Sequence, residues 1–139
     1  MTDPVMLDAT PLGRLAHRKP DPADVRRLSE LLWRGTTVLI PEIADYEVRR
    51  SLLLHGLSKS LRELDILKSR LRYIPISTPT MIKAAELWAE ARRKGRPTSD
   101  PRALDADVIL AAQALESGAT VVTENVSHLS RYVAVRPWR

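Results

Sequence analysis

Short apolar runs with the character of β-strands alternate along this chain with longer stretches of helical periodicity. The apolar runs are VML (5–7), TVLI (37–40), YIPI (73–76), TVVT (120–123) and VAV (133–135). The helical patterns between them cover residues 22–33, 42–56, 58–71, 79–94 and 105–117. Because strands joined through helices usually run parallel, this alternation predicts an α/β fold with helices on both faces of a parallel sheet.

The size and composition of the chain limit the alternatives. Its 139 residues suit one globular domain, so we expect a single domain over residues 1–139. The chain contains no cysteine, which excludes disulfides and thiolate metal sites. No apolar run is long enough to span a bilayer, and the first residues lack the pattern of a signal peptide, so we expect a soluble cytoplasmic protein.

Four polar residues fall where the predicted strands end or where the following helices begin. They are Asp8, Glu47, Asp107 and Asn125. In a parallel sheet the carboxyl ends of the strands share one edge with the beginnings of the following helices, and ligands bind there. We therefore expect these four side chains to meet at that edge.

A structural role would explain some of the acidic residues better than others. Asp8 directly follows a strand and could simply cap the next helix. Glu47 is expected to project on the same helix face as the apolar Ile43 and Leu54, where a carboxylate needs a partner or a cation. Glu42 and Asp45 fall in the first turn of that helix, where negative charge suits the helix dipole, so we interpret them as structural.

Asp105 and Asp107 stand at the beginning of an otherwise apolar helical pattern. Residues two apart on a helix do not share a face, so the two side chains cannot both enter one pocket. Asp105 precedes the apolar pattern and is expected to be the N-cap. Asp107 is in line with the small residues Ala111 and Ala114, which would let it approach the strand ends, and we predict it to be the functional acid.

An all-oxygen set of ligands points to a particular chemistry. Gathered carboxylates repel one another and are costly to remove from water, so they stay ionised together only around a cation. Oxygen ligands suit Mg²⁺ or Mn²⁺ rather than zinc. Such an ion can activate a bound water and neutralise a phosphate oxygen, so the site predicts phosphodiester cleavage.

The motifs VMLDATPL, IPEIADYEVRRSLL, LDADVILAAQALESGATVVTEN and VSHL, in this order, resemble those of the PIN-domain nucleases, and among these the small VapC-type toxins of toxin–antitoxin pairs. The resemblance implies a three-layer α/β/α sandwich with a central parallel sheet and a metal-dependent ribonuclease site. It implies three catalytic acids that are also metal ligands, Asp8, Glu47 and Asp107, with Asn125 as the fourth catalytic residue. Thr10, Thr123 and Asp105 are expected to support them.

This sequence departs from the commoner family pattern beside the fourth position. Asn125 is an amide where many relatives have an acid, and His128 stands where many have an aspartate before an aromatic residue. An amide oxygen can still ligate a metal or hold a bound water. Glu124 could restore the missing charge, but we do not favour it, and we interpret His128 as a surface residue.

The charge of the chain favours an anionic partner, for which RNA is the expectation. The net charge is +5, and most of the 22 basic residues are arginines, which suit bidentate phosphate contacts. We predict five phosphate ligands: Arg49, Arg50, Arg93, Lys94 and Arg96. The basic residues of 58–72 are interpreted as a solvated helix face. Because aromatic residues are few, we expect recognition of shape and backbone rather than extensive base stacking.

Other protein partners and other functions stay open at this stage. The family resemblance implies a homodimer and an inhibitory antitoxin, and the helical stretches LSELLW and LRELDILKSRL offer apolar surface for one or both. The main alternative function is a PIN-like protein that binds RNA or a partner without cutting. A receiver-like signalling module would need paired acids near the first strand and a lysine after a late strand, and neither is evident.

Overall fold

The strands of this chain form one parallel sheet of five strands, in the order β3–β2–β1–β4–β5. The computed structural model describes residues 3–95 and 101–139, with the backbone alone for residues 101–104. The strands are β1 (Val5–Leu7), β2 (Val38–Pro41), β3 (Arg72–Ile74), β4 (Thr120–Thr123) and β5 (Val135–Pro137). This sheet confirms the predicted parallel α/β fold.

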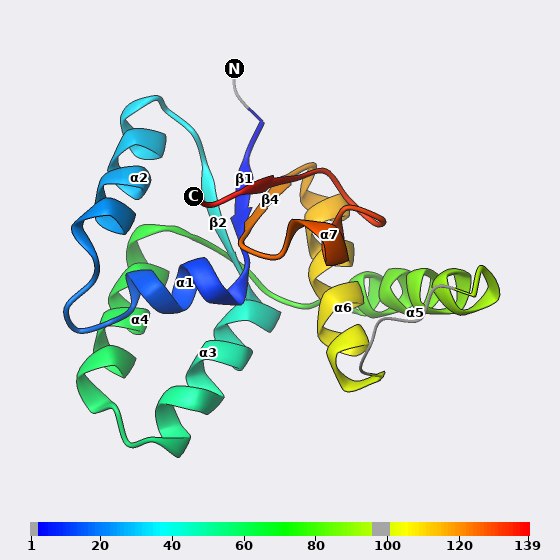
Figure 1. Ribbon diagram of the computed structural model, residues 1–139, viewed down its shortest axis with the longest axis horizontal. Helices are drawn as coiled ribbons and strands as arrows, with labels where there is room; N and C mark the ends of the chain where they lie inside the picture. Colours follow the sequence, from blue (N-terminus) through cyan, green and yellow to red (C-terminus); the bar gives the residue numbers. More distant parts are fainter. Residues whose placement is uncertain (1–2, 96–100) are drawn as a thin grey trace.

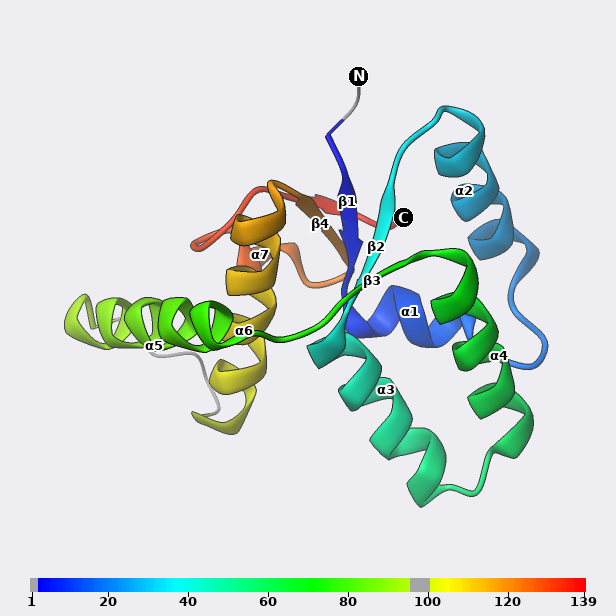
Figure 2. The same cartoon turned by 180° about the vertical axis from the view of Figure 1, so that it is seen from behind.

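Helices cover both faces of the sheet (Figures 1 and 2). One face carries α1 (Ala9–Leu15), α2 (Pro22–Trp33), α3 (Glu42–Leu54) and α4 (Ser58–Arg70). The other face carries α5 (Thr78–Arg93), α6 (Pro101–Ser117) and α7 (Val126–Leu129). Among the helices that the structure describes, none has the length and apolar character that crossing a membrane requires.

The core has two halves, one on each side of the sheet, because side chains alternate along a strand. In β1, Val5 and Leu7 pack against the α1–α4 side, whereas Met6 packs against the α5–α7 side. All three side chains are buried. A central strand buried on both faces is expected in a sandwich of three layers, and the architecture confirms the predicted α/β/α arrangement.

The structure differs from the expected elements most clearly at α6, α1, α7 and β5, and by one or two residues at the ends of several others. Helix α6 begins at Pro101, four residues earlier than expected, because proline at the first helical position has a suitable φ and needs no hydrogen-bond partner. The short helices α1 and α7 are absent from the expected helical patterns, although a capping role of Asp8 already implies a helix after it, and VSHL is only one turn long. Strand β5 begins at Val135 rather than Val133 because its register follows its pairing with β4.

Candidate active site

Asp8 lies at the carboxyl end of β1 and has both carboxylate oxygens engaged. It is the N-cap of α1, and its Oδ1 accepts a hydrogen bond from the backbone N–H of Ala9 at 2.7 Å. Its Oδ2 accepts a hydrogen bond from Thr123 Oγ1, also at 2.7 Å. Thr123 ends the neighbouring strand β4 and is fully buried, so the two strands jointly fix the orientation of Asp8. Asp8 thus combines the capping role with its place at the predicted edge.

Glu47 is on α3 and faces the same edge of the sheet. Burial, the first cause, and the negative charge of Asp8 raise the pKa of Glu47 to about 7. The charge of Asp107 acts in the same direction, and Arg50 opposes it. The three predicted acids therefore influence one another, although they come from β1, α3 and α6.

Asp107 approaches this edge from α6. Ala111 and Ala114, on the same face of the helix, are fully buried, so this face packs closely as predicted. Burial and the charge of Asp8 raise the pKa of Asp107. His128 and Arg131 oppose this rise in the pKa of Asp107 without cancelling it, so both side chains lie on the Asp107 side of the site.

The predicted N-cap role of Asp105 is wrong. Because α6 begins at Pro101, Asp105 lies in the second turn of the helix, where its side chain is exposed. It lines a groove between α5 and α6 with apolar residues such as Trp88 and Ile109. The separation of Asp105 from Asp107 onto different helix faces agrees with the expectation from helical spacing.

The turn after β4 places Asn125 and Glu124 in different surroundings. The backbone N–H of Asn125 donates to Thr123 Oγ1 at 2.9 Å, and its side-chain Nδ2 lies 3.1 Å from His128 Nδ1. Glu124 instead forms an ion pair with Arg14 of α1, whose Nε lies 2.9 Å from Oε1. Glu124 is therefore engaged by a cation of the chain itself, which agrees with not favouring it as the fourth ligand.

The donor set and the electrostatics fit a divalent cation. Asp8, Glu47 and Asp107 provide only oxygen atoms, and burial together with the charges of Asp8 and Asp107 raises the pKa of Glu47 more than Arg50 lowers it. In the part of the chain that the structure describes, however, no three histidine or acidic side chains are already grouped at ligand distance. Binding would therefore require the carboxylates to close around the ion.

The predicted phosphate ligands differ in their availability. Arg49 forms ion pairs with Asp45 at 2.9 Å and Asp65 at 2.7 Å, so its charge is already balanced, which weighs against a phosphate contact. Arg50 is exposed, acts on Glu47 and lies over the ring of Tyr46, with 5.2 Å from Cζ to the ring centroid.

Two further predicted phosphate ligands, Arg93 and Lys94, lie at the end of α5. Arg93 is exposed at the last position of α5, and Lys94 forms an ion pair with Glu90 at 2.8 Å. Arg96 lies outside the described residues. Thr10, predicted as a supporting hydroxyl, is exposed in the first turn of α1.

Sequence reasoning missed two side chains that adjoin the acids, Arg131 and Tyr132. Arg131 opposes the rise in the pKa of Asp107, and the charge of Asp107 adds to burial, the largest cause, in raising the pKa of Tyr132. Both follow the one-turn helix α7, which has too little periodicity to be identified from sequence. Only the packing of α7 against α6 brings them to the site.

The chain is similar to known proteins in sequence and in fold. The sequence profile of the PIN domain matches residues 5–133. Ribonuclease VapC2 of Rickettsia felis (strain ATCC VR-1525 / URRWXCal2) is 31% identical over 108 residues, which cover 73% of this chain and 73% of that protein.

Solved structures are similar to this chain in fold. A chain of VapBC2 from Rickettsia felis, bound to a DNA fragment from their promoter, has a TM-score of 0.79 at 25% identity, covering 97% of this chain and 98% of that one. A chain of FitAcB from Neisseria gonorrhoeae has a TM-score of 0.73 at 22% identity, covering 97% of this chain and 99% of that one.

Proposed function

This chain belongs to the PIN-domain family, and from that premise we propose that it is a metal-dependent endoribonuclease and the toxin of a toxin–antitoxin pair. The observation that carries the proposal is the mutual influence of Asp8, Glu47 and Asp107 at the carboxyl edge of the sheet. The Rickettsia felis relative, named a ribonuclease, supports RNA as the class of substrate.

Asp8, Glu47 and Asp107 would hold Mg²⁺ or Mn²⁺. When bound, such an ion lowers the pKa of a coordinated water and offsets charge on a phosphate oxygen. The hydrogen bonds from Ala9 and Thr123 keep the carboxylate of Asp8 oriented before the ion arrives. Because the pKa of Glu47 is about 7, this side chain holds a proton part of the time near neutral pH and must release it to bind a cation.

Two further groups contribute without carrying negative charge. Asn125 is anchored through its backbone to Thr123, and its amide would position the ion or a bound water at the edge of the site. Arg50, exposed beside Glu47, would attract the phosphate backbone of the substrate. This set of residues suits hydrolysis of a phosphodiester bond.

The decisive experiment measures cleavage of a labelled RNA by the purified protein in Mg²⁺, in Mn²⁺ and in excess EDTA. We expect cleavage with either ion and none with EDTA, and the Asp107→Asn variant serves as a folded control without activity. Undiminished cleavage in EDTA would overturn the metal mechanism. RNA binding without cleavage under all three conditions would favour the alternative, a PIN-like binding protein.

We assign the antitoxin to the hairpin of α3 and α4, which extends away from the sheet (Figure 1). It exposes large apolar side chains, including Leu54 at 81% and Leu53 at 61% exposure. Since Glu47 is on α3, a partner bound there would lie beside the acids. The similar VapBC2 structure supports an antitoxin as the partner. Leu54→Glu should abolish binding of the antitoxin while RNA cleavage continues.

We assign a homodimer contact to the groove between α5 and α6. The groove is mostly apolar and includes Met81, Trp88 and Ile109, and the neighbouring Ile82 is 57% exposed. Substitution Trp88→Glu should convert a dimer to a monomer in light scattering. An unchanged mass would place the contact elsewhere or show that the protein is monomeric.

A further inference from the structure

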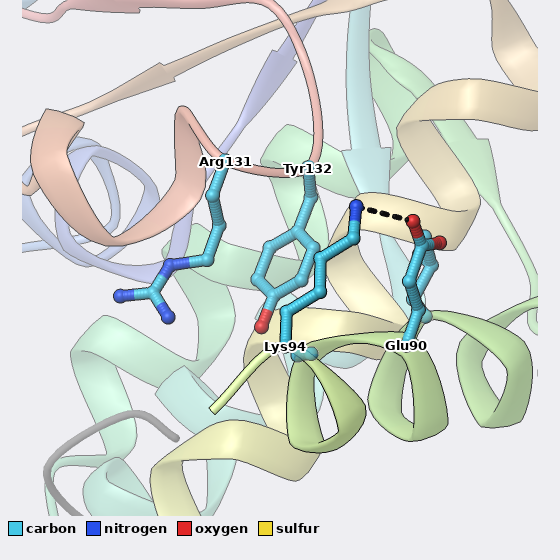
Figure 3. A pocket seen from close by; sticks show the side chains of 6 residues that line it. Glu90, Lys94, Arg131 and Tyr132 are labelled. Carbon is cyan, nitrogen blue, oxygen red and sulfur yellow. Dashed lines mark hydrogen bonds and ion pairs between the residues drawn. The ribbon is translucent and has the colours of Figure 1, made fainter. Parts of the chain in front are cut away.

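A cavity of about 250 Å³ lies between the end of α5 and the turn after α7 (Figure 3). It is lined by Leu87, Glu90, Ala91, Lys94, Arg131 and Tyr132. Glu90 and Lys94 project into it from α5, and Tyr132 stands between Arg131 and Lys94 in the view of Figure 3. Leu87 and Ala91 are buried and form the apolar part of its wall.

The cavity adjoins the acidic edge on the α6 side. Tyr132 packs against the core cluster that includes Val108 and Ala111 of α6, the helix that carries Asp107. Arg131 and Tyr132 both interact electrostatically with Asp107. A strand whose phosphodiester bond lies at Asp107 would therefore pass the opening of this cavity with a neighbouring nucleotide.

The polar groups of the cavity are mainly donors. The hydroxyl of Tyr132 is buried, and burial raises its pKa, so it stays protonated. Arg131 lies beside its ring, with 5.8 Å from Cζ to the ring centroid, but a guanidinium only donates and cannot accept the phenol proton. Among the described residues no other group accepts it. A buried donor without an acceptor costs free energy, and a ligand oxygen would satisfy it.

Lys94 adds a third donor, and its present partner is readily exchanged. Its ammonium lies 2.8 Å from Glu90 Oε1, and both side chains are more than half exposed. Exposed ion pairs of this kind contribute little to stability, so an incoming anion can replace Glu90 at Lys94 at small cost. Arg131, Tyr132 and Lys94 together match an oxyanion, and Glu90, beside Lys94, can accept a hydrogen bond from a hydroxyl.

We propose that this cavity binds one nucleotide of the RNA strand next to the scissile bond, with the phosphate on Arg131, Tyr132 and Lys94 and a ribose hydroxyl toward Glu90. The volume of about 250 Å³ leaves room for no more than one nucleotide. Leu87 and Ala91 provide an apolar wall for the sugar or base. The inference rests on the proposed function, since it assumes RNA at the acidic edge.

The experiment measures binding rather than cleavage, so that it does not depend on nuclease activity. A fluorescein-labelled single-stranded RNA of mixed sequence is titrated in EDTA with the wild-type protein and its variants over a series of salt concentrations. Arg131→Gln and Lys94→Gln should each raise Kd about tenfold and reduce the slope of log Kd against log salt by about 0.7, as expected for one lost phosphate contact with a single strand. Tyr132→Phe should raise Kd about threefold and leave the slope unchanged.

The matched control is Arg92→Gln, which removes an equal charge from the last turn of α5, close to Lys94. Arg92 lies over the ring of Trp88, at 4.6 Å, and does not line the cavity. We expect it to change Kd less than about twofold, with thermal midpoints confirming that all variants are folded. Equal effects of Arg92→Gln, Arg131→Gln and Lys94→Gln would overturn the proposal, since only general charge would then matter.

Two further outcomes separate this inference from the proposed function. If the wild type shows these binding differences but cleaves no RNA with Mg²⁺, the cavity assignment stands and the nuclease proposal fails. If the wild type cleaves RNA while every variant binds RNA as the wild type does, or if none binds RNA in EDTA, the cavity assignment fails.

Discussion

Among the places where this molecule removes aspartate or glutamate from water, Asp24 and the acidic edge have opposite electrostatic surroundings. Asp24, in the first turn of α2, is only 1% exposed. It accepts a hydrogen bond from Trp138 Nε1 at 2.8 Å, and Arg139 Nη2 donates to both carboxylate oxygens at 3.1 and 3.0 Å. Burial alone would raise the pKa of Asp24, but these hydrogen bonds and the charge of Arg139 lower it overall.

The acidic edge lacks such compensation. Glu47 and Asp107 are partly buried, the pKa of each is raised, and the largest cause after burial is the negative charge of Asp8. The chain thus neutralises Asp24 with Trp138 and Arg139 but leaves the pKa values of Glu47 and Asp107 raised. Carboxylates whose charge the fold does not balance are candidates for binding a cation, and the balanced one is a structural anchor.

The largest expected effect is the loss of cleavage in Asp107→Asn. The substitution keeps the shape of the side chain but removes one of three charges available to a cation, so the cleavage rate should fall roughly 10²–10⁴-fold. Asp105→Asn, on the exposed face of the same helix, is the control and should retain both activity and stability. Initial rates on one RNA substrate measure both. Equal losses in the two folded variants would show that the choice between the aspartates is wrong.

At the structural anchor the effect should be on stability instead. Asp24→Ala leaves Trp138 and Arg139 without their acceptor, and the free energy of unfolding should fall by about 3 kcal/mol, as for other broken buried pairs. Cleavage at a temperature where the variant is folded should be nearly unchanged. The exposed Asp65, paired with Arg49, is the control, and Asp65→Ala should cost less than about 1 kcal/mol. Similar losses of unfolding free energy in Asp24→Ala and Asp65→Ala, measured by urea unfolding, would contradict the role of Asp24 as a structural anchor.

Removing an acid from the acidic edge should raise the free energy of unfolding rather than lower it. Because the pKa of Glu47 rises from 4.5 to about 7 on folding, the folded state binds the proton more tightly than the unfolded state. The contribution of Glu47 to the stability of the metal-free protein should therefore be largest below about pH 4.5. It should be lost as the pH rises to about 7.

The substitution Glu47→Gln removes the free-energy cost of keeping a charged, partly buried Glu47 at high pH. At pH 8 without metal it should raise the free energy of unfolding by about 1–3 kcal/mol, although the enzyme loses activity, and the gain should shrink toward pH 5. The exposed Glu63→Gln should show no such pH-dependent gain. Urea unfolding in EDTA at the two pH values measures the difference. A destabilised Glu47→Gln variant at pH 8 would mean that the acidic edge is compensated after all.

The same contrast explains how much could be predicted from the sequence. The strand–helix alternation predicts the parallel sheet, and the order of Asp8, Glu47 and Asp107 predicts their common edge, because both depend on local patterns and on one rule of topology. The apolar pattern predicts the beginning of α6 incorrectly, because the helix already begins at Pro101.

Contacts between distant parts of the chain could not be predicted. Asp24 and its partner Trp138 are 114 residues apart, and Arg14 and Glu124 are 110 apart. Nothing local in the sequence distinguishes Asp24 from an ordinary acidic residue in the first turn of a helix, or Glu124 from a possible fourth metal ligand. Their roles follow from which arginine each one meets in the folded chain.

The smallest expected effect, and the finest test of the acidic edge, is at Asn125. Its amide carries no charge and cannot act as a base, and its backbone is already held by Thr123, so the side chain should position the ion or a water. Asn125→Asp should keep activity and tighten Mg²⁺ binding, since a fourth carboxylate adds attraction for a divalent ion. Asn125→Ala should weaken the apparent Mg²⁺ affinity by about tenfold and change the rate at saturating Mg²⁺ less. Cleavage rate against Mg²⁺ concentration for the three proteins measures both quantities. If the alanine variant matches the parent throughout, Asn125 lies outside the site, and its neighbour His128 becomes the better candidate, because Glu124 is held by Arg14.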